Sequence, residues 1–331
     1  MRRYLSRLRG LALVAPCVGA MLLAPQLVGA SNLTIYPVPT HGSGPYHIVR
    51  GSDGAFWFTE IEGSKIGRIT SSGSVTEFPL ARESYPHGLT SASDGGIWFA
   101  EYKADKIGRI HPQVRSTDPA PKIVEYALPA GELPKHIVQF GKGDLFFTES
   151  GTSSIGRMTL SGRYVTSYPV GTHGGLNGIA AASNAIWFEQ TDGRIGRLDP
   201  VTGAVTEHGG ISGVPHHVAR GPDGNLWFTE PSSGRIGRMN PTSGAVSEWT
   251  IPPRAGYTSY PNTAVAGPNL TVLFPDSGSG QIDMFDTRTQ KVSVTSLPSV
   301  ISDPVGIATA PDGSIWFCED AGSAIGHLTG F

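Results

Sequence analysis

The sequence has very little cysteine and no excess of charge of either sign. Its only cysteines are Cys17 and Cys318, too few for a scaffold held by disulfides. Lys and Arg total 25 against 27 Asp and Glu, and the mature part of the chain contains no basic block. These absences argue against nucleic acid or an anionic membrane surface as the main partner.

Long amphipathic helical patterns are also absent, which favours an all-β chain. The N-terminus is different: a basic start precedes the apolar run LALVAPCVGAMLLAPQLV, and Val28-Gly29-Ala30 is a small-residue cleavage pattern. We therefore predict a signal peptide over residues 1–30, and an exported, periplasmic or extracellular protein without membrane contact after cleavage. Two prolines in the apolar run disfavour the alternative, an uncleaved anchor. Cleavage would remove Cys17 and leave Cys318 unpaired.

Glycine and proline are abundant, with 44 and 26 residues, and favour frequent tight turns. One phrase recurs, as DGAFWFTEIEGSKIGRI at 53–69, DGGIWFAEYKADKIGRI at 94–110, DGNLWFTEPSSGRIGRM at 223–239 and DGSIWFCEDAGSAIGHL at 312–328. Its anchor positions are 40 to 48 residues apart, and six of the seven are aromatic: Trp57, Trp98, Phe146, Trp187, Trp227, Leu273 and Trp316. This period is typical of propeller blades of four strands.

Each repeat contains four short strand patterns, such as PHGL, IWFAE, KIGRI and SVTEFPL, and Asp-Gly pairs predict the first hairpin turn. The seventh repeat ends without a fourth strand, whereas LTIYPVP at 33–39 precedes the first repeat. We predict an all-β, seven-bladed β-propeller over residues 31–331, closed by the N-terminal strand in the last blade. We expect this single domain to be a monomer.

An acidic residue follows the aromatic strand in six of the seven repeats. Because frame residues recur and catalytic residues need not, we expect these acids to bind backbone amides or the recurring arginines. The acids are Glu60, Glu101, Glu149, Glu230, Asp276 and Glu319, with Gln190 in the fourth repeat. The arginines are Arg68, Arg109, Arg157, Arg197 and Arg238.

The first strand of each repeat is where the repeats differ most. One column of positions holds Tyr46, His87, Lys135, Asn177, His216, Asn262 and Val305. The next column holds His47, Gly88, His136, Gly178, His217, Thr263 and Gly306. Five of the ten histidines fall in these two columns, which we expect to face the mouth of the ring. Histidine serves as base, acid or metal ligand near neutral pH.

The motifs YPHG at 85–88 and VPHHV at 214–218, with the repeated IWFTE and KIGRI units, carry a family resemblance. From Leu33 to Phe331 the chain resembles the virginiamycin B lyase, or streptogramin B lyase, family. The resemblance implies a seven-bladed propeller that opens a cyclic depsipeptide without water. In that reaction a histidine removes a Cα proton, Mg²⁺ polarises the lactone and a carboxylate leaves.

The resemblance implies His87 as the base and His216 as its catalytic partner. It implies Glu83 and Glu101 as candidate ligands of Mg²⁺, and a small cyclic peptide or lactone as the ligand. An alternative arrangement uses the His216–His217 pair with Glu230 as the candidate metal ligand. Candidate substrate-binding residues are the remaining polar positions at the mouth: Tyr46, His47, Lys135, His136, Asn177, His217 and Asn262. In the seventh repeat, where the family pattern predicts EPHG, the chain has DPVG at 303–306.

Two other functions stay open at this point. One is a metal-dependent hydrolase of lactones or sugar-like substrates, with His47, His136 or His217 as ligands. The other is a non-catalytic exported propeller that binds a ligand or protein through mouth tyrosines and the insert Ile251–Asn262. Export argues against a dedicated role in antibiotic resistance, since antibiotics that act on ribosomes are usually met in the cytoplasm.

Overall fold

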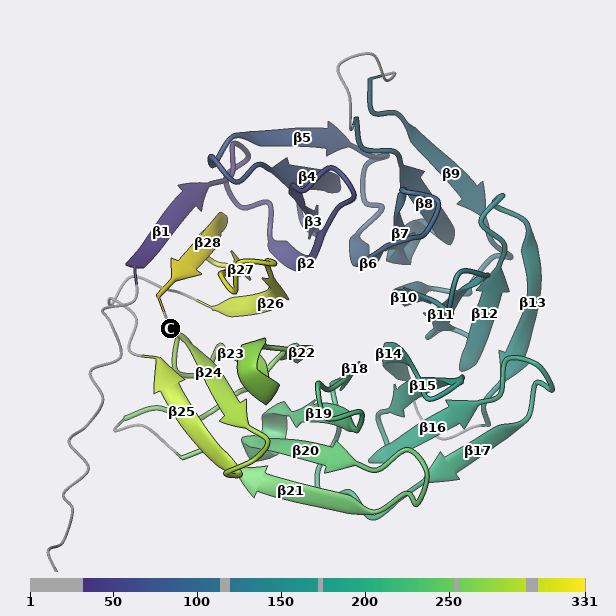
Figure 1. Ribbon diagram of the computed structural model, residues 1–331. Coiled ribbons are helices and arrows are strands. Elements are labelled where there is room, and N and C mark those ends of the chain that lie inside the picture. Colours follow the sequence, from purple (N-terminus) through teal and green to yellow (C-terminus); the bar gives the residue numbers. More distant parts are fainter. Residues whose placement is uncertain (1–31, 114–119, 172–174, 253–255, 296–302, 331) are drawn as a thin grey trace, which may run out of the picture.

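Seven antiparallel sheets of four strands surround a central axis in the computed structural model (Figure 1). The structure describes residues 32–113, 120–171, 175–252, 256–295 and 303–330. It confirms the predicted all-β, seven-bladed propeller. The predicted signal peptide, residues 1–30, lies outside the described residues, as do positions 253–255 of the insert.

Each blade contributes four strands, numbered from the axis outward. Blades one to three contain β2 (Pro45–Arg50), β3 (Phe56–Glu60), β4 (Lys65–Ile69) and β5 (Val75–Pro79); β6 (Pro86–Ser91), β7 (Ile97–Glu101), β8 (Lys106–Ile110) and β9 (Ile123–Ala127); and β10 (Pro134–Gln139), β11 (Leu145–Glu149), β12 (Ser154–Met158) and β13 (Tyr164–Pro169).

Blades four to six contain β14 (Leu176–Ala182), β15 (Ala185–Gln190), β16 (Arg194–Leu198) and β17 (Val205–His208); β18 (His217–Arg220), β19 (Leu226–Glu230), β20 (Arg235–Met239) and β21 (Val246–Thr250); and β22 (Val265–Ala266), β23 (Thr271–Asp276), β24 (Gln281–Asp286) and β25 (Lys291–Thr295). The short 3₁₀ helices are η1 (Tyr102–Ala104), η2 (Pro231–Ser233) and η3 (Pro268–Leu270). None of the helices in the described part is long and apolar enough to cross a membrane.

The seventh blade joins the two ends of the chain. It contains β26 (Pro304–Thr309), β27 (Ile315–Glu319), β28 (Ala324–Thr329) and β1 (Asn32–Pro37). β1 pairs antiparallel with β28, from Asn32 opposite Thr329 to Pro37 opposite Ala324. The Tyr36 ring also stacks on Trp316, with ring centroids 5.9 Å apart. The predicted closure by the N-terminal strand is confirmed.

The recurring Asp-Gly turn and Trp are joined by hydrogen bonds. In blade one the indole Nε1 of Trp57 donates to Asp53 Oδ1 at 3.2 Å, and Arg68 Nε donates to Asp53 Oδ2 at 2.7 Å. Arg109 pairs in the same way with Asp94. The expectation that the recurring arginines pair with the acids after the aromatic strand is therefore wrong for these blades. The turn aspartate lies closer, because Arg68 lies opposite Trp57 in the antiparallel pair of β3 and β4, at the end of β3 that is nearest Asp53.

The glycine of the IGR phrase makes room for the phenylalanine of the neighbouring strand. Gly67 lies opposite Phe58 across β3 and β4, and a Cβ atom on Gly67 would lie 2.1 Å from Phe58 Cζ. Phe58 itself is fully buried. The repeated phrase thus encodes the packing within each blade, and the blades place their first strands around the axis.

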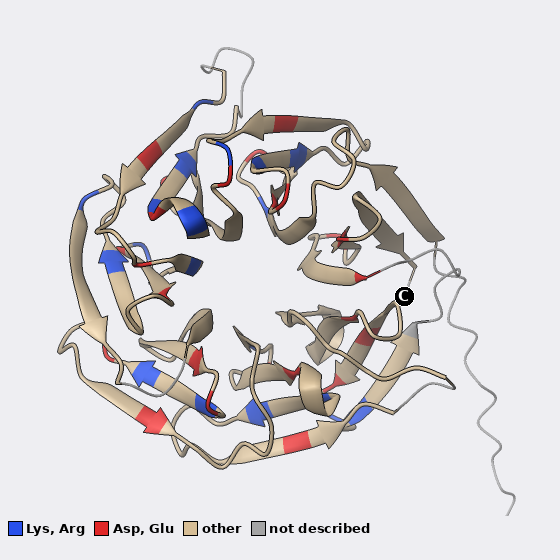
Figure 2. Ribbon diagram, turned by 180° about the vertical axis from the view of Figure 1, so that it is seen from behind, with Lys and Arg blue, Asp and Glu red and all other residues tan. Residues whose placement is uncertain are grey.

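Charged residues do not gather on one part of the ring. Figure 2 shows acidic and basic residues interspersed around the blades in the described part of the chain. This distribution agrees with the near-neutral composition.

Candidate functional site in the axial channel

A shift of register at the start of the first strands presents consecutive residues to the axis. In blade one Pro45 lies opposite Glu60 and Ile48 opposite Phe58, so one extra residue stands in β2 between these pairs. The same shift occurs in β6, β10, β14 and β26. Such a bulge interrupts the strict alternation of faces along a strand. Adjacent residues of both predicted columns can therefore contribute to one site.

His87 lies at the mouth among aromatic and basic side chains. Its ring is 4.6 Å from the Tyr46 ring and 6.3 Å from the Tyr102 ring, measured between centroids. The Lys135 Nζ atom lies 5.6 Å from the centre of the Tyr102 ring. Burial lowers the pKa of His87 to about 3, and the charge of Lys135 contributes. The imidazole is therefore neutral at pH 7, and it is a weaker base than an exposed histidine.

His216 belongs to the same site although it comes from blade five. Its charge is one cause of the lowered pKa of His87, a residue of blade two. Burial, with a contribution from Lys135, lowers the pKa of His216 as well. The first strands surround a narrow axis, so blades that are not neighbours still face each other (Figure 1).

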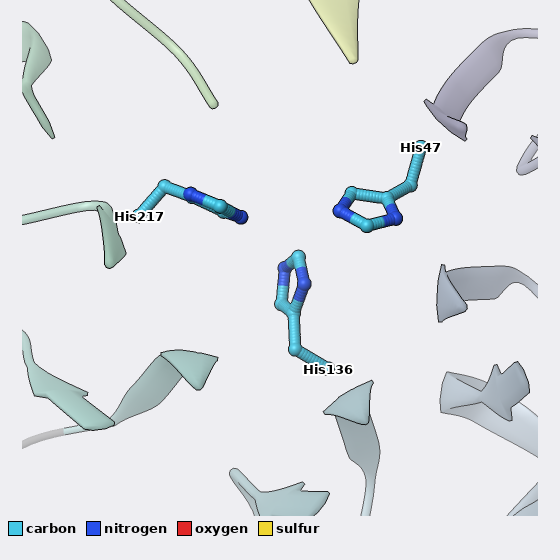
Figure 3. Close-up of side chains that lie close together, drawn as sticks. All are labelled: His47, His136 and His217. Carbon is cyan, nitrogen blue, oxygen red and sulfur yellow. The ribbon is translucent and has the colours of Figure 1, made fainter. Parts of the chain in front are cut away.

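Three further histidines, from blades one, three and five, converge on the axis next to His87. Figure 3 shows the rings of His47, His136 and His217 directed toward a common point. Each offers a ligand atom within 4.8 Å of those of the other two. His136 also connects this group to His87, because the ring centroids of His136 and His87 lie 4.9 Å apart. We call His47, His136 and His217 the histidine triad.

The two predicted asparagines join neighbouring blades. Asn177 Nδ2 donates to the carbonyl oxygen of His216 at 2.7 Å, and Asn262 Nδ2 donates to that of Pro304 at 3.4 Å. Both side chains are buried. Their amide donors therefore stabilise the inner ring, and their contact with a substrate stays a prediction.

The carboxylates predicted to bind Mg²⁺ occupy separate places. Glu83 is exposed between β5 and β6, whereas Glu101 and Glu230 are buried at the ends of β7 and β19. Burial raises the pKa of both buried residues to about 7. In the described part of the chain, the triad is the one group of three or more such ligating side chains within 4.8 Å. Because Mg²⁺ prefers oxygen ligands, this donor set does not fit it.

Sequence reasoning missed Glu189, the residue before the predicted Gln190. Gly178 N–H donates to Glu189 Oε2 at 3.0 Å, and the side chain is fully buried. Burial raises its pKa well above the usual range, and its charge acts on Tyr46 at the mouth. The signal was available, because this position holds Thr59, Ala100, Thr148, Glu189, Thr229, Pro275 and Cys318 in successive blades.

A cavity of about 420 Å³ extends along the axis from the triad. Its walls are mostly apolar, with residues such as Val49, Val138 and Ala219. Arg50 and Arg220 line it at the other end of the first strands and are exposed. The channel thus joins a polar, histidine-rich end to an end with positive charge.

The fold and this axial site define a seven-bladed propeller with a histidine-lined channel. The chain belongs to the Virginiamycin B lyase family, whose sequence profile matches residues 24–211 and 189–330. It is 28% identical over 204 residues to virginiamycin B lyase of Nocardia farcinica, covering 61% of this chain and 68% of that protein.

Solved structures agree with this assignment. The structure of selenomethionine-substituted virginiamycin B lyase from Staphylococcus aureus has a TM-score of 0.81 and 31% identity, covering 90% of this chain and 99% of that chain. A catalytically inactive histidine-to-alanine variant of the S. aureus enzyme, solved with quinupristin, has a TM-score of 0.80 and 30% identity with the same coverage.

Proposed function

We propose that the protein opens the lactone of a cyclic depsipeptide by β-elimination, with His87 as the base. The observation that carries this proposal is the place of His87 beside Tyr46 and Lys135 at the mouth of a propeller of this family. Its Nδ1 atom is buried and has no hydrogen-bond partner in the described part of the chain. Because burial lowers the pKa of His87 to about 3, a bound substrate would have to raise that pKa for the imidazole to act as an efficient base.

The reaction requires a proton acceptor and a group that stabilises negative charge. The Cα proton moves to the imidazole, a Cα–Cβ double bond forms, the Cβ–O bond breaks and the carboxylate leaves. Lys135 is half-buried beside His87, and its ammonium group would stabilise the charge that develops on the substrate. His216 lies at the same mouth and would position the substrate or share the proton. The described residues offer no cluster of carboxylates for the Mg²⁺ that the family resemblance implies, so no step is assigned to it.

The test is an assay of the purified protein with quinupristin, the compound in the S. aureus complex. Reactions with Mg²⁺ and with EDTA are followed by mass spectrometry. A linear product of unchanged mass, lost in His87→Ala and retained in His111→Ala, would support elimination. His111 is a suitable control because it is exposed beyond the end of β8. A product heavier by one water would indicate hydrolysis instead, and product formation unaffected by His87→Ala would contradict the assigned base.

A second function, ligand binding without catalysis, is favoured by the seventh blade. Val305 is buried at 6% exposure where the family pattern predicts a histidine, and Asp303 replaces the expected glutamate. Saturable binding of quinupristin in calorimetry, with no product after prolonged incubation, would support this function over the lyase.

We also propose that the protein acts outside the cytoplasm after removal of residues 1–30. The basic start, apolar run and cleavage pattern of the sequence support this location. Mass spectrometry of the N-terminus in periplasmic and medium fractions tests it. A mature chain that begins at Ser31 is expected, whereas an intact N-terminus in the cytoplasmic fraction would overturn it.

A further inference from the structure

We propose that the histidine triad binds a divalent transition-metal ion of the Zn²⁺ class in the axial channel. Imidazole nitrogen suits such ions, and three histidines with an open fourth position form a known type of zinc site. The triad differs in position and donor chemistry from the carboxylates expected to bind Mg²⁺.

The geometry requires only a small contraction of the three rings. The ligand atoms lie within 4.8 Å of one another, and the rings come from β2, β10 and β18 toward one point (Figure 3). Zinc–nitrogen bonds of about 2.0–2.1 Å place tetrahedral ligands roughly 3.3 Å apart. Side-chain rotation of about 1 Å in each ring would therefore close the site.

Glycines in the intervening blades leave the space that the rings occupy. A Cβ atom on Gly88 would lie 2.8 Å from His136 Nδ1, and one on Gly306 would lie 2.9 Å from His47 Cα. The column thus holds histidine in blades one, three and five, with glycine in blades two, four and seven. The sequence provides both the ligands and the room for them.

A threonine accompanies each histidine of the triad, twelve residues further along the chain. Thr59, Thr148 and Thr229 are the threonines at this position, and the other four blades have different residues there. Thr148 Oγ1 accepts a hydrogen bond from His136 N–H at 3.1 Å and donates one to the Asn177 carbonyl at 2.8 Å. Thr59 bonds in the same way to His47 N–H and the His87 carbonyl.

The three blades that carry a triad histidine therefore differ from the other four at two positions, that of the histidine and that of the threonine twelve residues later. Thr59 and Thr148 each fix the backbone that carries a triad ring. Thr229 lies opposite His217 and donates to the Asn262 carbonyl. A set of rings held in this way is preorganised for a common ligand.

The tautomer of His217 decides which of its nitrogens can bind a metal ion. Ala264 N–H donates to His217 Nδ1 at 3.2 Å, so in the neutral ring Nδ1 carries the lone pair and Nε2 the proton. Metal binding at Nε2 therefore requires this proton to move to Nδ1 and the hydrogen bond from Ala264 to break.

The fourth coordination position would face the axial cavity. This cavity of about 420 Å³ is large enough for water or a small ligand, and Arg50 and Arg220 at its other end favour an anion. A small carboxylate is therefore a suitable fourth ligand, and an open position distinguishes such a site from a closed structural one.

The first experiment is calorimetric titration of the purified, chelator-treated protein with Zn²⁺ alone. We expect one ion per chain and an affinity at least about tenfold weaker in His47→Ala, His136→Ala and His217→Ala. His111→Ala serves as the matched control and should bind like the original protein. Thermal unfolding of each variant verifies that the propeller is intact.

A further readout keeps the proposal independent of any lyase activity. Co²⁺ should give the visible absorption of a tetrahedral nitrogen site, and this absorption should disappear in His136→Ala. Absence of Zn²⁺ binding, or equal binding by folded His136→Ala, would overturn the site. Quinupristin turnover has no bearing on either outcome.

Discussion

The amide of Gln190 donates a hydrogen bond of 2.9 Å to Glu207 Oε1 in blade four. Blade one has Glu60 and Glu77 at the two corresponding positions, on β3 and β5. Burial raises the pKa of Glu60 to about 7, and the charge of Glu77 contributes. A protonated carboxyl can donate as the Gln190 amide does, whereas an ionised one cannot. Gln190 in blade four thus takes the place of a protonated glutamate, which is the protonation state that we expect for Glu60.

This relationship predicts that stability falls as the pH rises. Burial raises the pKa to about 7 in Glu60, Glu101, Glu149 and Glu319. A raised folded-state pKa gives stabilisation that is complete below the unfolded pKa, near 4.5, and lost as the pH rises through 7. Glu60→Gln should remove about 2 kcal/mol of the decrease in unfolding free energy between pH 5 and 8. Urea unfolding between pH 5 and pH 8 measures the unfolding free energy of the variant and of the original protein.

Glu62→Gln is the matched control, because Glu62 is exposed two residues away. It should leave the pH dependence unchanged. An identical pH dependence in Glu60→Gln and the original protein would show that Glu60 is already ionised in the folded state at pH 5.

The glycine of the IGR phrase should not tolerate replacement even by alanine. Gly67→Ala would place Cβ 2.1 Å from the Phe58 ring in the core of blade one, and overpacking of this kind costs about 1–3 kcal/mol. Gly209→Ala is the control, because nothing lies within 4 Å of the added atom and its backbone is not left-handed. Thermal unfolding of both variants tests this, and equal midpoints would contradict the packing argument.

The fold was predictable because it depends on residues that recur. The Trp anchors, the Asp-Gly turns and the unmatched strand at 33–39 determine the blade count and the closure, which pairing of β1 with β28 confirms. The partners of the recurring arginines were not predictable from spacing alone. Arg68 follows Glu60 by eight residues and Asp53 by fifteen, yet the antiparallel hairpin places it beside Asp53.

The site was predictable only as two columns of positions. Histidines in blades two and five looked distant in the sequence, but strands around a narrow axis bring His87 and His216 to one mouth. Convergence of His47, His136 and His217 depends on side-chain rotation and, in β2 and β10, on the register shift, which no periodic pattern encodes. Glu189 was not predicted as a site residue, because the pattern of the repeats marks the next residue, Gln190, where the ring of acids is interrupted.

Replacement of Glu189 by glutamine should be tolerated, whereas its truncation to alanine should destabilise the protein. Its Oε2 atom accepts from Gly178 N–H, and a glutamine oxygen can accept the same bond. Glu189→Gln should therefore stay within about 1 kcal/mol of the original protein, whereas Glu189→Ala should lose about 2–3 kcal/mol through a cavity and an unpaired N–H group. Urea unfolding at pH 6 compares them. Equal losses in both variants would mean that the carboxyl proton itself is required.

Thr148→Val tests whether Thr148 only stabilises the inner ring or also positions the histidine triad. Valine keeps the shape but removes the hydroxyl that links His136 N–H to the Asn177 carbonyl, at a cost of about 1–3 kcal/mol. Because the backbone of His136 is then less constrained, Zn²⁺ affinity should also fall, by about tenfold. Thr206→Val, on the exposed face of β17, should change neither quantity. A stability loss with unchanged Zn²⁺ affinity would show that Thr148 supports the fold without positioning the ligand.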